Sequence, residues 1–243
     1  MSNLSIRVDG LKKKLGPNQA LDGLTSHFEA GRLHGIIGPD GAGKTTLLRH
    51  LMGLLTPTAG TVQWLDGGKP VAFAAVRPTL AYMPQTQSLY GDLSISEHLD
   101  FFRDLYGVEE GDYQARRKQL LHLTRLDRFI DRPAGKLSGG MYKKLGLMCA
   151  LLAQPRALLL DEPTNGVDPV SRREFWELLM ELLKQKILIL VATAYMDEAE
   201  RCDKVHLISR GRLLDEGEPR QLLTAHKAKR FDDIFLAAAG AKP

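Results

Sequence analysis

The stretch GPDGAGKTT, from Gly38 to Thr46, decides the fold of this 243-residue chain. It places the pattern G-x-x-x-x-G-K-T between an apolar strand at 33–37 and a helix with one apolar face. That face is made by Leu47, Leu48, Leu51, Met52 and Leu54. A glycine-rich turn with a lysine can be no more than a tight connection, but these flanking elements favour a phosphate-binding loop.

The loop carries groups that can bind a chain of phosphates. Its glycines permit positive φ and let backbone N–H groups close around an anion at the positive end of the helix. Lys44 can reach the β and γ phosphates, and the hydroxyl of Thr45 can ligate Mg²⁺. The predicted nucleotide contacts of the loop are Gly38, Pro39, Asp40, Gly41, Ala42, Gly43, Lys44, Thr45 and Thr46.

A second apolar run, Ala157 to Leu160, is typical of a strand buried on both faces of a parallel sheet. It delivers Asp161 and Glu162 at its carboxyl end, where α/β sheets bind ligands. We expect Asp161 to face the metal and Glu162 to act as the base for an attacking water. The alternative for this acidic pair is a solvated strand end.

Two further motifs suit a nucleotide enzyme. LSGGM, at 137–141, opens a helix with apolar residues at helical spacing, so Ser138, Gly139 and Gly140 lie at its positive end and form a second anion site. Without other motifs this sequence is equally a helix N-cap with flexible glycines. Gln85 follows a short strand that ends at Pro84, where its side chain can contact Mg²⁺ or water.

These motifs together resemble the nucleotide-binding subunit of ATP-binding cassette (ABC) transporters, in the family's order and over about residues 4–217. The resemblance implies an α/β P-loop NTPase fold: a RecA-like core with an antiparallel β subdomain and an inserted helical subdomain. We expect one domain over 1–243, with the core at about 1–85 and 135–217, a helical docking lobe at about 86–134 and a C-terminal appendage at about 218–243.

The resemblance also implies the ligands, the partners and the residue roles. ATP and Mg²⁺ are the expected ligands, and two cassettes dimerise head to tail with each ATP between one P-loop and the other subunit's LSGG. A separate transmembrane permease is the other partner. The expected catalytic residues are Glu162, Gln85 and Lys44, and the expected metal ligands are Thr45, Gln85 and Asp161.

The sequence departs from the family pattern at two positions. Ala194 stands where most hydrolysing cassettes carry a histidine that contacts the γ-phosphate, so one transition-state contact is missing. Thr193 and Tyr195 flank this position but point to the other face of an extended chain. Leu15 takes the place of the aromatic residue that stacks on adenine, and it offers apolar contact without a π face.

Helix signals flank these motifs. Ser94 and Glu97 have capping-box spacing before an apolar run, and a second helix is expected at about 113–126. We expect most of the aromatic side chains here to pack in the core. They are Phe101, Phe102 and Tyr106.

Three signals follow the acidic pair. Asp168 lies in the loop that crosses to the partner cassette, and Pro169 begins a helix. The stretch FDDIFLAAAG near the C-terminus, 231–240, is typical of an appended helix.

Composition limits the alternatives. With 44% hydrophobic residues the chain is long enough for one sizeable α/β domain with a smaller lobe. No apolar run reaches the length of a membrane span and no signal segment precedes the domain, so we expect a cytoplasmic protein bound to the inner face of the membrane through the permease. The net charge of +4 is mild, and no pattern indicates nucleic-acid binding. Cys149 and Cys202 are expected to be reduced packing residues.

The chain also resembles a sub-family, the first ATPase half of tandem-ATPase multidrug-exporter subunits. The resemblance lies in GPDGAGK, in LSGGM with its lysine-rich continuation, in NGVDP at 165–169, and in the replacement of the family's histidine by Ala194, which we call the switch position. In that setting the chain is a fragment or a free-standing relative. Two alternatives remain open. One is a regulatory half that binds ATP but depends on a partner cassette for hydrolysis, and the other is a soluble ABC protein that acts on ribosomes or another assembly.

Overall fold

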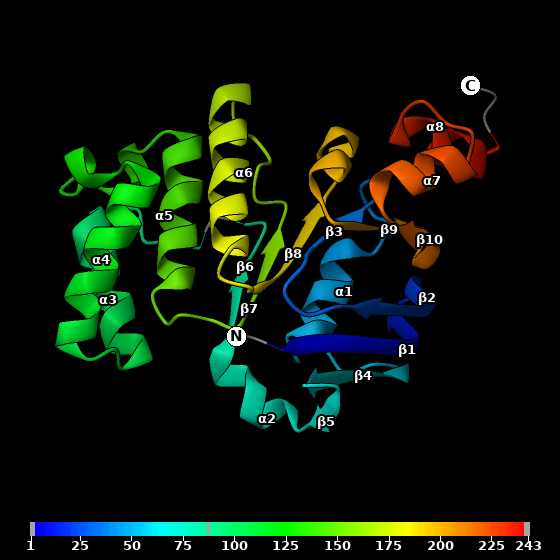
Figure 1. Ribbon diagram of the computed structural model, residues 1–243, viewed down its shortest axis with the longest axis horizontal. Helices are drawn as coiled ribbons and strands as arrows, with labels where there is room; N and C mark the ends of the chain where they lie inside the picture. Colours follow the sequence, from blue (N-terminus) through cyan, green and yellow to red (C-terminus); the bar gives the residue numbers. More distant parts are fainter. Residues whose placement is uncertain (1–2, 87, 241–243) are drawn as a thin grey trace.

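The computed structural model describes residues 3–86 and 88–240; residues 1–2, 87 and 241–243, which the predicted domain ranges include, lie outside the described part. Its centre is a six-stranded sheet with the order β10-β9-β3-β8-β7-β6 (Figure 1). The strands of this sheet are β3 (Leu33–Ile37), β6 (Leu80–Met83), β7 (Ala157–Asp161), β8 (Leu188–Thr193), β9 (Lys204–Ser209) and β10 (Arg212–Gly217). All neighbours are parallel except β9 and β10.

A smaller antiparallel sheet with the order β2-β1-β4-β5 lies beside this central sheet (Figure 1). Its strands are β1 (Leu4–Leu15), β2 (Asn18–Phe28), β4 (Ala59–Asp66) and β5 (Lys69–Val71). The mixed α/β architecture with a separate antiparallel sheet agrees with the fold class expected from the sequence.

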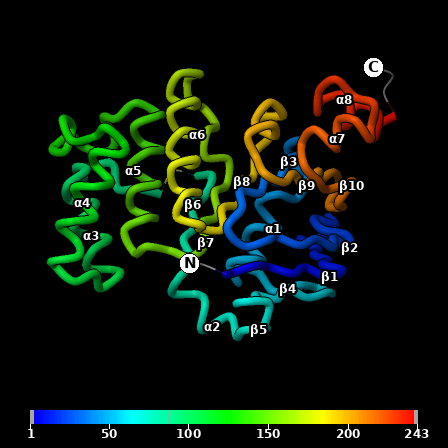
Figure 2. Tube along the Cα trace, viewed as in Figure 1, coloured from blue at the N-terminus to red at the C-terminus, as the bar shows by residue number. Residues whose placement is uncertain are grey.

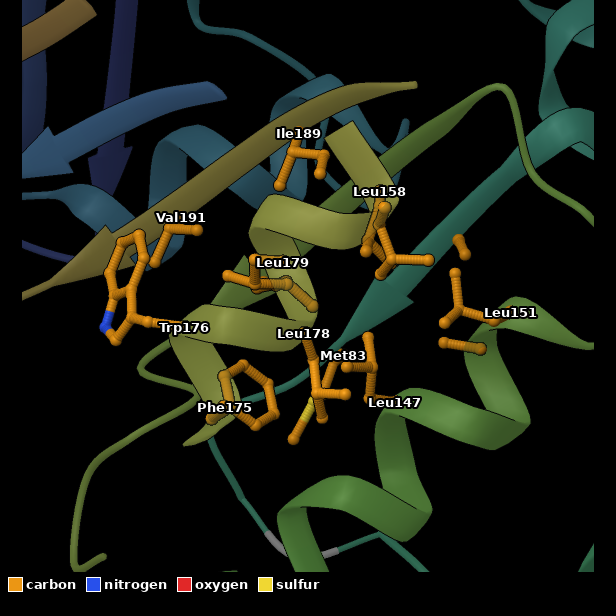
Figure 3. Packing of buried hydrophobic residues seen from close by; sticks show 14 of the residues in the cluster. Met83, Leu147, Leu151, Leu158, Phe175, Trp176, Leu178, Leu179, Ile189 and Val191 are labelled. Atoms are coloured by element: carbon orange, nitrogen blue, oxygen red, sulfur yellow. The ribbon is translucent and has the colours of Figure 1, made fainter. Parts of the chain in front are cut away.

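Alternate residues of the central strands face two different cores, as a side-chain period of two requires. In β7, Leu158 and Leu160 face the core under α5 (Gly139–Leu151) and α6 (Pro169–Leu183). Leu159 faces the opposite core, which α1 (Lys44–Leu51) shares with the antiparallel sheet. Figure 3 shows the first core, where Phe175, Trp176, Leu178 and Leu179 of α6 meet Met83, Leu158, Ile189 and Val191 of the sheet and Leu147 and Leu151 of α5. Burial on both faces explains why these strands are continuously apolar.

The segment between β6 and α5 forms a helical lobe at one end of the molecule (Figures 1 and 2). Its helices are α3 (Ile95–Tyr106) and α4 (Glu110–Thr124), so the second helix begins three residues before its expected start. The predicted capping box is confirmed: the Glu97 N–H donates to Ser94 Oγ and the Ser94 N–H donates to Glu97 Oε2. A short helix, α2 (Phe73–Val76), precedes β6.

Two predictions about apolar residues were wrong. Leu54 lies beyond the end of α1 with 60% of its surface exposed, whereas Met52, the C-cap residue of this helix, packs partly against the core as expected. Phe101 and Tyr106 are exposed rather than core residues, while Phe102 packs partly against the core. The sequence pattern misled because an apolar side chain at helical spacing marks a contact surface without saying what covers it.

The chain ends in two short helices, α7 (Pro219–Ala225) and α8 (Phe231–Ala238), as the appended helix predicted. Both pack against the 3₁₀ turn Met196–Arg201 that follows β8, and Phe231 and Ile234 are buried there. Cys149 and Cys202 are free and buried, as expected. Within the described residues, no helix has the length and apolarity to cross a membrane.

Replacing Leu179 by alanine tests the packing of α6 on the sheet. Leu179 is fully buried, so the substitution leaves a cavity and should lower the free energy of unfolding by about 2–5 kcal/mol, measured by urea denaturation. The control is Met180→Ala on the same helix, where 38% of the side chain is exposed and a change within about 0.5 kcal/mol is expected. Equal losses for the two variants would contradict this packing.

Candidate functional site

The phosphate-binding loop lies between β3 and α1, and two of its glycines stand where a side chain would clash with the backbone. Gly43 has φ 107°, and a Cβ there would lie 2.6 Å from the carbonyl oxygen of Ala20. A Cβ at Gly38 would lie 2.1 Å from the carbonyl oxygen of Ile208. The loop therefore takes its course tightly against β2 and β9, which only residues without a side chain allow.

Lys44 is anchored between this loop and the acidic strand end. Its Nζ donates to the carbonyl oxygens of Gly38 at 2.8 Å and Pro39 at 3.2 Å. It also forms an ion pair with Glu162 Oε1 at 3.0 Å, with both side chains 5% exposed. These contacts place one buried cation and one buried carboxylate beside the amides of the loop.

Asp161 is completely buried and accepts two hydrogen bonds. Thr45 Oγ1 donates to its Oδ1 at 3.0 Å and the Tyr82 hydroxyl donates to its Oδ2 at 3.1 Å. Burial raises the pKa of the Asp161 carboxyl, against these hydrogen bonds, and burial together with Asp161 raises the pKa of Tyr82 to about 12. Tyr82 was missed by the sequence analysis, although the period of two in β6 puts it on one face with Leu80.

The side-chain oxygens of Thr45 and Asp161 fit a magnesium ion. Mg²⁺ takes oxygen ligands and is usually held by one or two protein groups together with phosphate and water. In the part of the chain that the structure describes, no cluster of three or more His, Cys, Asp or Glu side chains forms a complete metal cage. A carboxylate beside a threonine hydroxyl at the mouth of a phosphate loop is the donor set expected for a metal that the nucleotide helps to hold.

Glu162 has an unusual backbone. Its φ is 50°, in the left-handed region that costs a residue with a Cβ about 1–2 kcal/mol. Neighbouring groups hold this conformation: the Glu162 N–H donates to the Ala192 carbonyl at 2.8 Å, and Lys143 Nζ reaches the Glu162 carbonyl at 3.4 Å. Lys143 is itself buried, and burial lowers its pKa against the attraction of the two carboxylates.

The switch position meets the same glutamate. The backbone N–H of Ala194 points to Glu162 Oε2 at 3.3 Å. Neither neighbour fills the place of the absent imidazole, because the Thr193 hydroxyl accepts the N–H of Tyr195 and the Tyr195 ring lies against Arg172. The contact that this chain offers at the switch is therefore a backbone amide.

The structure brings most of the predicted loop residues and Gln85 to one cavity. Its lining consists of Ala20, Asp40, Gly41, Ala42, Gly43, Lys44, Thr45, Thr46, Gln85 and Glu162. Ala20 was not predicted, since nothing in its local sequence marks it; it enters through the close approach of β2 to the loop. Leu15 is 46% exposed at the β1–β2 turn and is not among the lining residues, so its contact with adenine stays a prediction.

Ser138, Gly139 and Gly140 lie outside this cavity, at the start of α5. Ser138 is the N-cap and its Oγ accepts the N–H of Met141, which confirms the predicted helix start. A Cβ at Gly140 would lie 2.5 Å from Ser171 at the start of α6, so this glycine allows the two helix ends to meet. The LSGG helix end therefore does not belong to the phosphate cavity of the same chain.

The fold and the site define a P-loop ATP-binding domain. The family model for ABC transporters matches residues 21–165. The chain is 44% identical over 233 residues to the probable multidrug ABC transporter ATP-binding protein YbhF of Escherichia coli (strain K12), covering 95% of this chain and 40% of that protein. It is 38% identical over 220 residues to Nod factor export ATP-binding protein I of Ralstonia nicotianae (strain ATCC BAA-1114 / GMI1000), covering 90% of this chain and 68% of the relative.

A solved structure of the ATP-binding subunit of an ABC transporter superposes with a TM-score of 0.81 at 29% identity, covering 96% of this chain and 98% of the other. The chain therefore belongs to the ABC transporter family, as an ATP-binding domain. It spans 40% of the length of YbhF.

Replacing Lys44 by methionine tests the loop as the phosphate site. Removing the cation deletes charge-assisted hydrogen bonds of the kind that contribute about 1.5–3 kcal/mol each, so the dissociation constant for ATP should rise roughly 10- to 100-fold. Isothermal titration calorimetry measures this change. The matched control is Lys69→Met on the exposed β4–β5 hairpin, where ATP binding should stay as in the wild type. An unchanged affinity in Lys44→Met would contradict the site.

Proposed function

We propose that this chain binds and hydrolyses MgATP in a head-to-tail dimer of cassettes and thereby drives a separate transmembrane permease of the exporter type. The observation that carries the proposal is the buried pair of Lys44 and Glu162 at 3.0 Å, beside an Asp161 that is bonded to Thr45. A cation suited to phosphate, a carboxylate suited to act as a base and a pair of oxygen donors suited to a metal therefore lie together at one edge of the sheet.

These positions support a role for each residue in the proposed reaction. Lys44 and the loop amides bind the β and γ phosphates, and Glu162 takes the proton of the attacking water while Gln85 orients it. Thr45 and Asp161, with Gln85, would hold Mg²⁺, which supplies charge neutralisation on the phosphate oxygens. Ser138, Gly139 and Gly140 close on the nucleotide held by the partner cassette through their helix N-terminus.

The helical lobe supplies a surface for the permease. Tyr90, Phe101, Phe102 and Tyr106 form a continuous aromatic row, with successive ring centroids 5.3–5.6 Å apart. Tyr90, Phe101 and Tyr106 are exposed, and exposed apolar groups that gather on one surface are typical of an interaction site. We assign this aromatic row to the permease contact, which would place the protein at the cytoplasmic face of the membrane.

The names of the relatives favour transport over the two alternatives drawn from the sequence. The two relatives are named as ATP-binding proteins, one of a multidrug transporter and the other of Nod factor export. By this resemblance the proposed cargo path belongs to an exporter, and the chain corresponds to one cassette of a longer or multi-subunit assembly.

Single-turnover hydrolysis with Mg²⁺ and ATP tests the proposal on the purified chain. Turnover that falls by at least 10²-fold in Glu162→Gln, with ATP affinity retained, is the expected result, because the amide cannot accept the proton. The same variant should form a dimer on adding MgATP, seen by light scattering. Turnover that does not depend on Glu162 would contradict its role as the base.

The switch position gives a second test. Ala194→His restores a side chain that can donate to the γ-phosphate, so kcat should rise severalfold or more. Ala194→Leu, which adds bulk without a donor, is the control and should not accelerate turnover. An unchanged rate in Ala194→His, with Glu162 still essential, would mean that another group already performs this role.

A further inference from the structure

Arg172 lies on the first turn of α6, next to Ser171 and four residues after the N-cap Asp168. Its guanidinium carbon is 4.1 Å from the centroid of the Tyr195 ring. The same guanidinium donates to Glu198 Oε1 at 3.1 Å and to Asp197 Oδ2 at 3.2 Å. One side chain of α6 thus grips three residues of the segment that follows β8.

One of these three contacts of Arg172 is with a buried side chain. Glu198 is fully buried, and its Oε1 also accepts the hydroxyl of Thr164 at 2.8 Å. Thr164 follows Glu162 by two residues, so Glu198 joins the segment after β7 to the segment after β8. A buried carboxylate needs a paired cation, and Arg172, with 20% of its side chain exposed, is that cation.

The segment that Arg172 contacts follows directly after Ala194, the residue whose backbone N–H contacts Glu162. Ala194 immediately precedes Tyr195, and its N–H points to Glu162 Oε2 at 3.3 Å. Since no imidazole is present at this position, the location of that N–H depends on the backbone, and the backbone depends on what holds Tyr195 and Glu198.

We propose that Arg172 is a positioning residue, which holds the Ala194 N–H against the carboxylate of Glu162 by stacking on Tyr195 and pairing with Glu198. The inference rests on the proposed role of Glu162. The start of α6 also meets the LSGG helix end, because a Cβ at Gly140 would lie 2.5 Å from Ser171, the neighbour of Arg172. Binding of the partner cassette's nucleotide at the LSGG helix end would therefore affect the turn after β8, whose Ala194 N–H contacts Glu162.

Arg172→Lys is the test variant. Lysine keeps a positive charge beside Glu198 but lacks the planar guanidinium group that donates to Glu198 and Asp197 and stacks on the Tyr195 ring. We expect kcat to fall about 5- to 20-fold, below the ~10²-fold that a 1 Å misplacement produces, while KM and the dissociation constant for ATP stay within about twofold. Tyr195→Leu, which leaves all the ion pairs in place, should lower kcat in the same way.

The matched control is Arg173→Lys, the same substitution one residue further on. Arg173 is 74% exposed and pairs with Glu177 of its own helix, so its kcat should equal that of the wild type. In the Glu162→Gln background, Arg172→Lys should cause no additional loss, because the residue acts through Glu162. Arg172→Lys with wild-type kcat overturns the inference.

Hydrogen exchange of the segment 193–197 gives a readout that does not need turnover. Release of the grip should expose the N–H groups of Ala194 and Tyr195, so their exchange should accelerate in Arg172→Lys and stay unchanged in Arg173→Lys. If Glu162→Gln leaves turnover intact, the proposed role of the base fails while the exchange measurement still decides whether Arg172 holds the segment. Unchanged exchange in Arg172→Lys sinks the inference.

Discussion

The register of three parallel strands is the constraint on which the site depends. β8 is hydrogen-bonded to β3 on one side and to β7 on the other, with Thr193 opposite Ile37 and Ala192 opposite Asp161. Their carboxyl ends consequently stop at one level, and each is followed at once by a functional segment: the phosphate loop, the acidic pair and the switch. Residues more than a hundred positions apart in sequence meet because backbone hydrogen bonds bring three strand ends together.

The site is also a set of groups that need one another. The Lys44–Glu162 pair is almost completely buried, and taking two charges out of water is costly unless each is the other's partner. Glu162 adds a left-handed backbone, held by the Ala192 carbonyl and by Lys143. Such local strain persists where the surroundings over-determine it, and here the surroundings are the two neighbouring strand ends.

The sequence predicted those features that local chemistry dictates. The sequence predicted the glycines and Lys44 of the loop, the Ser94–Glu97 capping box, and the helix starts at Ser138 and Pro169, because each depends on residues within a few positions of one another. Periodicity failed at Leu54 and Phe101, because an apolar pattern does not say whether a neighbour in the same chain covers it.

Contacts set by topology were not predictable from one sequence. Tyr82 reaches Asp161 across 79 positions, and Arg172 reaches Glu198 across 26. Nothing in the local pattern around either residue marks it as part of the site. Ala20 belongs to the same class, since its place in the phosphate cavity comes from the approach of β2 to the loop.

The substitution at the switch changes which physical property controls the site. A histidine side chain reaches its target through two rotatable bonds and can adjust, whereas a backbone N–H moves only with the strand end that carries it. In this chain the N–H of Ala194 contacts Glu162 Oε2 at 3.3 Å, so this contact depends on the position of β8 and of the turn after it. That turn packs against α7 and α8, and Arg172 forms ion pairs with its residues Asp197 and Glu198. The packing of these two helices and of Arg172 therefore bears on where the N–H of Ala194 lies.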